Sequence, residues 1–271
     1  MTIEIHQDRA IFEISGQDRK KFIQGLITND INKVSDSALI YSAMLNPKGR
    51  FACDLFIFET QEKLIFDCPK EIIDPIIQKL NMYKLRADVE IKKNTNLIVG
   101  YIEKQDSNQP SLTFLDPRTP ALGYRTYFNP SAEIQNKTEQ KYDFLRIQNK
   151  IPEGFKDLTP EKSLILEFNF DNLNAIDYQK GCYIGQELTS RTHYRGEIRK
   201  KILHIKFSLQ TPDLDKVKKN AEITCEGKVV GIILSSVCLA SEIHALALIK
   251  TIETSSNQRF FIEENPIIIV D

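Results

Sequence analysis

A predicted β-hairpin early in the chain limits the choice of fold class. Two strand-like apolar runs, at residues 39–45 and 51–58, flank Asn46-Pro47-Lys48-Gly49, which has the composition of a tight turn. Apolar residues at helical spacing predict one helix after Ser15-Gly16 and another that starts at Pro69. Hairpins with separate helices indicate an α+β fold, because a parallel sheet would need strands and helices to alternate.

The C-terminal part of the chain has a different pattern. After Ile198, short strand-like runs are separated by turn sequences such as Glu226-Gly227, a spacing typical of a small antiparallel β-barrel. A polar stretch without periodicity at residues 103–110 predicts a surface loop. The sequence therefore predicts two parts: an α+β region at residues 1–195, made of two interleaved subdomains, and a C-terminal β-barrel at residues 196–271.

Composition and charge exclude several broad classes of protein. The formal net charge of −1 predicts no strong overall attraction to nucleic acid or to an anionic membrane. No apolar run is long enough to span a bilayer, and the first residues lack the pattern of a secretion signal. The five cysteines are an odd number without a CxxC pair, which argues against a disulfide framework and against a zinc or cluster cage. These features predict a cytoplasmic protein that does not bind membranes.

The most informative segment is residues 178–196, which is rich in glycine, cations and hydroxyl groups. Cys182 lies between Gly181 and Gly185, just before a predicted helix at residues 184–191. A helix N-terminus and the nearby Lys180 would stabilise a thiolate, so Cys182 is a candidate reactive or metal-ligating thiol. On chemistry alone, however, a single cysteine in such a setting is more often a small buried apolar side chain.

This segment resembles the signature of the YgfZ family, in which K-G-C-Y-x-G-Q-E is followed by a basic tail. The matching residues are Lys180, Gly181, Cys182, Tyr183, Gly185, Gln186, Glu187, Arg191, Arg195, Gly196, Arg199 and Lys200. Three further segments resemble the same family: Ser15-Gly16-Gln17-Asp18 with Phe22 and Gln24-Gly25, Asn46-Pro47-Lys48-Gly49-Arg50 with Asp54, and Tyr83-Lys84-Leu85-Arg86. Two more resemble the related aminomethyltransferase: Gly227-Lys228-Val229-Val230-Gly231 is similar to its C-terminal barrel, and Leu166-Glu167 precedes the cysteine segment at the spacing of its folate-contacting glutamate. The chain departs from the family at residues 146–153, where Gln148 and Lys150 replace residues that are often Glu and Gly.

The resemblance implies an aminomethyltransferase-like folate-binding fold and a role in iron–sulfur cluster assembly. The family is related to the glycine-cleavage aminomethyltransferase and assists the assembly or repair of [4Fe–4S] clusters on client enzymes, with indirect effects on tRNA modification. The implied cofactor is tetrahydrofolate, and the implied partner is an A-type iron–sulfur carrier. Because one cysteine cannot hold a cluster that needs about four thiolates, Cys182 would act together with that partner.

The resemblance also implies a set of site residues. Cys182 and Asp54 are the candidates for direct chemistry. The candidates for cofactor binding are Glu167, Asn46, Lys48, Arg50, Tyr83, Arg86, Lys180, Tyr183, Gln186, Glu187 and Arg191. These residue types suit folate, since a carboxylate pairs with the adjacent N–H donors of a pterin, aromatic rings cover its faces, and guanidinium groups bind the glutamate tail.

Two other functions stay open at this point. The first is a folate-dependent one-carbon transferase, which Asp54 favours; the aminomethyltransferase relative has an acidic pair where this chain has Cys53-Asp54, and this argues against the full reaction. The second is direct nucleic-acid binding, because five cations between Arg191 and Lys201 lie near tyrosines that could stack on bases. The net charge near zero favours a carboxylate or protein contact for this basic stretch.

Overall fold

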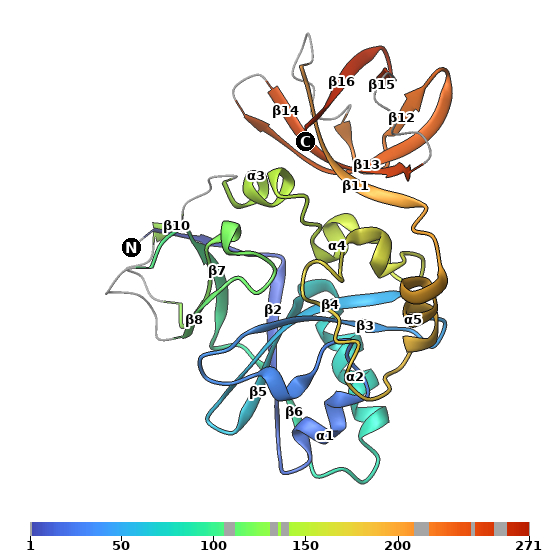
Figure 1. Ribbon diagram of the computed structural model, residues 1–271. Helices are drawn as coiled ribbons and strands as arrows, with labels where there is room; N and C mark the ends of the chain where they lie inside the picture. The colour runs from blue at the N-terminus through green and yellow to red at the C-terminus, as the bar shows by residue number, and fades with distance from the viewer. Residues whose placement is uncertain are drawn as a thin grey trace.

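A computed structural model describes residues 2–105, 112–130, 135–136, 141–208, 217–239, 242–251 and 259–270 (Figure 1). These residues form two five-stranded sheets and a closed barrel, which lies above the sheets in the view of Figure 1. Most of the surface loop expected at residues 103–110 lies outside the described residues.

The first sheet contains the predicted hairpin and has the strand order β3-β4-β5-β2-β6. Its strands are β2 (Arg9–Ser15), β3 (Ile40–Leu45), β4 (Phe51–Thr60), β5 (Lys63–Pro69) and β6 (Glu90–Asn94). β4 is apolar along most of its length because both of its faces are covered. Phe56 and Phe58 belong to the central core, whereas Leu55 and Ile57 pack in a second core with α1 (Arg19–Gln24) and α2 (Ile73–Lys84).

The second sheet has the order β10-β1-β7-β9-β8. Its strands are β1 (Thr2–Ile5), β7 (Ile98–Ile102), β8 (Leu112–Leu115), β9 (Tyr124–Phe128) and β10 (Gln135–Asn136). β1 pairs antiparallel with β7 and parallel with β10, although β2, the next strand of the chain, belongs to the first sheet. The two sheets share the central core, where the ring of Phe58 lies 4.8 Å from the rings of both Phe114 and Tyr127.

The connection from the second sheet to the barrel is mostly irregular. It contains α3 (Lys141–Gln148), α4 (Gly154–Asp157), the single turn η4 (Ile165–Phe168) and α5 (Gln186–Arg195). Three short turns earlier in the described chain are η1 (Ile31–Lys33), η2 (Lys70–Ile72) and η3 (Pro120–Leu122). α3 and α4 both contact β13 of the barrel, and α4 also contacts β4, so these helices join the barrel to the sheets (Figure 1).

The C-terminal strands close into a barrel of order β11-β14-β13-β12-β15-β16, which confirms the predicted α+β fold with an antiparallel β-barrel. The strands are β11 (Lys200–Ser208), β12 (Glu222–Cys225), β13 (Lys228–Leu239), β14 (Glu242–Lys250), β15 (Phe260–Ile262) and β16 (Asn265–Val270). β16 was not predicted, because Asn265-Pro266 at its start is typical of a turn. Across the described ranges, no helix combines the length and the apolar character needed to cross a membrane.

Candidate functional site

The hairpin turn and the cysteine segment pack directly against each other. Gly49 in the turn has φ +74° and Gly185, which precedes α5, has φ +83°. A Cβ on Gly185 would lie 2.6 Å from the carbonyl oxygen of Asn46 and 3.0 Å from the Cα of Gly49. Two glycines therefore bring two backbone segments, more than a hundred residues apart in the sequence, into contact.

Lys180 anchors the cysteine segment to the end of α1. Its ammonium group donates hydrogen bonds to the carbonyl oxygens of Gln24 (2.6 Å), Ile27 (2.7 Å) and Asn29 (2.8 Å). Burial lowers the pKa of Lys180 to about 8. Because an ammonium group has three donors and all three are used, Lys180 serves to hold the segment in place. The sequence-based expectation for Lys180 was support of the Cys182 thiol or cofactor binding, and in the structure its donors bind these three carbonyls.

Cys182 is exposed, whereas Cys53, Cys68 and Cys225 are buried and Cys238 is half-buried. All five cysteines are free. Exposure rules out the reading of Cys182 as a buried apolar side chain. The helix that follows begins at Gln186 and not at residue 184, so the thiol lies beyond the first turn, where the influence of the helix dipole has declined.

The backbone around Cys182 is held on both sides. The Asp177 carboxylate accepts hydrogen bonds from the amides of Gln179 and Lys180, and the amide of Ile184 donates to the carbonyl of Gly25 at 3.0 Å. Within the described ranges, no cluster of three or more His, Cys, Asp or Glu side chains could hold a metal ion. Cys182 is thus an accessible thiol on an ordered loop that offers no complete metal cage of its own.

Several of the predicted cofactor residues lie near Cys182 but have structural contacts. The side-chain oxygen of Asn46 accepts hydrogen bonds from the amides of Lys48 and Arg50 and so closes the hairpin turn. Arg50 donates to the carbonyl of Lys162 at 2.9 Å. Lys48 is exposed at the tip of the turn.

The other predicted residues of this neighbourhood line α5 and the connection before it. Tyr183 is buried, with its ring 5.3 Å from the Lys180 ammonium nitrogen, and its amide donates to the side chain of Gln186 at 3.4 Å. Glu187 and Arg191 are exposed on α5. Glu167 is half-buried in η4, which contacts α5.

Asp54 lies in a different place, inside a buried cluster of charges between the two sheets and α4. Arg9 donates to both oxygens of Asp54, at 3.2 and 3.0 Å, and to Asp67 at 2.6 Å. Arg125 donates to the other oxygen of Asp67, also at 2.6 Å. Burial raises the pKa of Asp54, and the charge of Arg9 opposes this effect. Gly154 presses against the Asp54 carboxylate and leaves no room there for a Cβ.

This cluster was not predicted from the sequence. The guanidinium carbons of Arg9, Arg118 and Arg125 lie 5.4, 4.8 and 3.9 Å from the centre of the Phe56 ring. A signal existed, because Asp67 and Arg125 are single charges within apolar or strand-like runs, and a charge that enters a core must find a partner. The partners themselves come from other strands, which the sequence does not identify.

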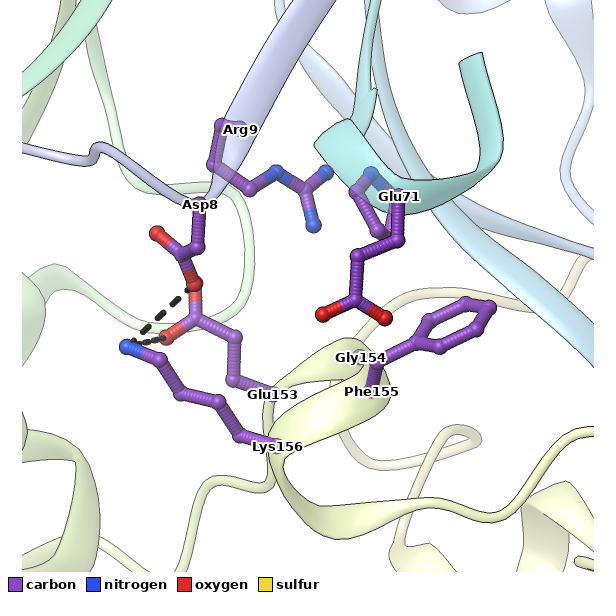
Figure 2. Close-up of a pocket in the computed structure, with 8 residues that line it drawn as sticks. Asp8, Arg9, Glu71, Glu153, Gly154, Phe155 and Lys156 are labelled. Atoms are coloured by element: carbon purple, nitrogen blue, oxygen red, sulfur yellow. Dashed lines mark ion pairs between the residues drawn. The ribbon is translucent and has the colours of Figure 1, made fainter. Parts of the chain in front are cut away.

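The cavity beside this cluster is too small for tetrahydrofolate. It has a volume of about 160 Å³ and is lined by Asp8, Arg9, Pro69, Glu71, Glu153, Gly154, Phe155 and Lys156. Figure 2 shows the Lys156 ammonium group facing the carboxylates of Asp8 and Glu153, and these ion pairs measure 3.4 and 3.8 Å. Pockets for ligands of that size usually measure about 300 Å³ or more.

The predicted folate residues also do not gather around one cavity. Asp54 is fully enclosed, and Tyr83 and Arg86 lie at the exposed end of α2, where Leu85 is 86% exposed. A larger hollow of about 550 Å³ between β5, β6 and β8 is lined by none of the predicted residues. Neither of these two hollows therefore gathers the residues that the resemblance assigned to tetrahydrofolate.

Comparison with known proteins places the chain beside iron–sulfur cluster assembly factors. No protein-family model matches it. The mitochondrial iron–sulfur cluster assembly factor IBA57 homologue of Mycosarcoma maydis is 32% identical over 229 residues, or 74% of this chain and 56% of that protein. The homologue of Dictyostelium discoideum is 28% identical over 80% of this chain and 65% of that protein. Human IBA57 is 28% identical over 82% of this chain and 71% of that protein.

The first two of these relatives are much longer than the aligned part, so the chain spans between half and two thirds of their length. All three are named as mitochondrial proteins. This finding overturns the expectation of a cytoplasmic protein, which rested on the cysteine pattern and on the first residues.

Among solved structures, the chain is similar to the glycine cleavage system aminomethyltransferase T from Bartonella henselae. The TM-score is 0.75, and the match covers 99% of this chain and 84% of that chain at 11% identity. The likeness confirms the predicted aminomethyltransferase-like fold. At such low identity it concerns the fold alone.

Proposed function

We propose, from the similarity to the IBA57 proteins, that this protein is an iron–sulfur cluster assembly factor that works with a cluster-carrying partner. The observation that carries the proposal is the exposure of the Cys182 thiol on a loop held by Lys180 and Gly185. A fixed loop presents the sulfur in one position, which lowers the conformational entropy lost when a partner binds.

The proposed chemistry follows from the number of thiols. A [4Fe–4S] cluster is usually held by about four thiolates, and Cys182 supplies one. The partner, an A-type iron–sulfur carrier, supplies the others. The Cys182 thiol loses its proton to solvent, its sulfur binds one iron of the cluster, and one ligand of the carrier leaves. The reverse exchange releases the cluster to a [4Fe–4S] client enzyme.

Two finer expectations belong to the same proposal. Membership of the YgfZ branch rests on the K-G-C-Y-x-G-Q-E segment at residues 180–187. An effect on tRNA modification would be indirect, through [4Fe–4S] enzymes among the clients. Tetrahydrofolate has no step in this proposal, because Asp54 is paired with Arg9 and the adjacent cavity is small.

A one-carbon transferase is the alternative function that the aminomethyltransferase-like fold suggests. Two residues oppose it. Asp54 is enclosed and paired, and Cys53 is buried with a pKa that burial raises to about 12, so its thiol stays protonated at neutral pH. Incubation of the protein with tetrahydrofolate and aminomethylated lipoyl carrier would test this alternative; sustained turnover would replace the assembly-factor proposal.

The proposed function is tested by cluster transfer from a loaded A-type carrier to an apo [4Fe–4S] client, followed by client activity and visible circular dichroism. Cys182→Ser should lower the transfer rate by about tenfold or more, since a lost ligand or its support typically weakens a metal site to that extent. Cys238→Ser is the matched control, because Cys238 is the other cysteine that is not fully buried. It should transfer as fast as the wild type.

Two results would contradict the proposal. Equal transfer by Cys182→Ser and the wild type would remove the thiol from the mechanism. A stable Cys182 persulfide or disulfide with the carrier, formed without any cluster signal, would instead indicate a redox role. Mass spectrometry of the carrier mixture under anaerobic conditions separates these two roles.

A further inference from the structure

The outer surface of α5 has a hollow, lined mostly by carbon atoms of polar and charged side chains, that the proposed cluster chemistry does not use. This hollow, which we call the α5 hollow, has a volume of about 360 Å³. It is lined by Ser190, Arg191, Tyr194 and Arg195. Arg191 and Arg195 are exposed, and Tyr194 is 68% exposed. These residues present two guanidinium groups and two hydroxyl groups around one depression.

The cations of the α5 hollow are not neutralised by the protein. Arg191 and Arg195 are four positions apart on one helix, an arrangement in which like charges repel each other. In the part of the chain that the structure describes, neither guanidinium forms an ion pair or a hydrogen bond. The net charge of the whole chain is −1, so this positive surface is a local feature. A partner with carboxylates would relieve the repulsion and pair with both groups.

A stack of rings holds this surface in place. The rings of Tyr178 and His193 are stacked, with centroids 3.9 Å apart and planes at 19°. Tyr194 meets the His193 ring edge-on at 4.8 Å and lies 6.0 Å from the Tyr178 ring. These two ring contacts restrict the exposed Tyr194 side chain, so it can contact a partner with little further loss of conformational freedom.

The α5 hollow lies close to Cys182. Tyr178, before the cysteine, contacts the last turn of α5, and Tyr183, after it, contacts Gln186 and Thr189 in the first turns. The loop with Cys182 thus runs alongside α5, whose 10 residues extend about 15 Å. Figure 1 places α5 at the outer edge of the molecule, beside the strands β3 and β4 of the hairpin. A protein that reaches the thiol is within reach of the arginines.

We propose that the α5 hollow is the docking site for an acidic segment of the cluster-carrying partner. Carboxylates of that segment pair with Arg191 and Arg195, and its chain packs on Tyr194. The contact aligns the partner's cluster with Cys182 and favours carriers with an acidic surface over neutral or basic proteins. This inference rests on the proposed function, but it assigns docking and ligation to different residues.

The test measures binding of the cluster-loaded A-type carrier to the full chain by surface plasmon resonance at low and at moderate salt. The variant Arg191→Glu/Arg195→Glu should weaken binding by about tenfold or more, mainly through slower association. Arg259→Glu is the matched control, because Arg259 is an exposed arginine directly before β15 of the barrel, and it should bind as the wild type does. An oligoglutamate peptide should compete with the carrier, and an oligoglutamine peptide should not.

The Cys182→Ser variant separates docking from the proposed function. It should bind the cluster-free carrier with an affinity close to that of the wild type and yet fail in cluster transfer. If Arg191→Glu/Arg195→Glu binds and transfers as the wild type does, the docking inference is wrong while the role of Cys182 stands. If the wild type itself does not bind the carrier, or retains single-stranded RNA through these arginines in a salt-dependent way instead, the inference is also overturned. Circular dichroism checks that each variant is folded.

Discussion

Gly49 and Gly185 lie backbone against backbone, so that a Cβ on Gly49 would come within 2.9 Å of the Gly185 carbonyl oxygen. This contact joins the turn of the β3–β4 hairpin to the start of α5. The glycines determine how closely the Cys182 loop approaches the first sheet, and Lys180 holds the other side of that loop.

Replacement of Gly185 by alanine should destabilise the protein. Alanine at this position would have to adopt φ +83°, and its Cβ would lie 2.6 Å from the Asn46 carbonyl oxygen. We therefore expect a loss of about 1–3 kcal/mol in the free energy of unfolding. Urea unfolding measures the change. Gly181→Ala is the control, because a Cβ there meets no atom within 4 Å, and it should unfold at nearly the same urea concentration as the wild type. Equal midpoints for the two variants would show that the close contact carries no strain.

The Arg9–Asp54 pair should behave as a coupled unit. Arg9→Met leaves two fully buried carboxylates without this guanidinium and should lower the free energy of unfolding by about 3–5 kcal/mol. Asp54→Asn should cost less, because burial raises the pKa of this carboxyl group and so favours an uncharged side chain. The double variant should therefore be more stable than the sum of the single changes predicts.

A double-mutant cycle by urea unfolding measures this coupling. The control cycle uses Arg19 and Glu59, a half-exposed pair at 3.0 Å, for which we expect a coupling of about 0–1 kcal/mol. Additive effects at Arg9 and Asp54 would mean that the cluster tolerates each charge alone. Such a result would reopen the question of whether Asp54 is available to a ligand.

Stability should fall in mild acid because of His204 in the barrel. Burial, helped by the neighbouring His244, lowers the pKa of His204 from 6.5 to about 4. Between these values the unfolded chain binds more protons than the folded protein, so the free energy of unfolding decreases as the pH falls from 6.5 towards 4. The groups that face this ring are His244 at 2.9 Å and, further out, Glu242, Lys206 and Lys150.

Thermal unfolding across this pH range checks the expectation. His204→Gln should reduce the slope of stability against pH, and part of the slope should persist, because burial lowers the pKa of His6 to about 3. His193→Gln, at an exposed position on α5, is the control and should leave the slope unchanged. A slope that is the same in the wild type and in His204→Gln would contradict the assignment.

Prediction and structure agree best for elements formed by residues that are close together in the sequence. The hairpin was predicted at residues 39–45 and 51–58 and is found at Ile40–Leu45 and Phe51–Thr60, since a turn and its flanking runs are local features. β1 was missed because it is short and its partners, β7 and β10, are distant in the sequence. The folate residues were grouped by resemblance, and in the structure Asp54 is fully buried, whereas Tyr83 and Cys182 are exposed.

Local patterns of residues were enough to predict the hairpin, the C-terminal barrel strands other than β16, and a segment in which one cysteine lies among glycines and cations. The three-dimensional packing was needed to see that the Cys182 thiol is exposed, that the Lys180 ammonium group binds backbone carbonyls, and that Arg9 pairs with Asp54. The reason is physical. Exposure and charge pairing depend on which segments, far apart in the chain, exclude water from one another, and no local pattern of residues records that.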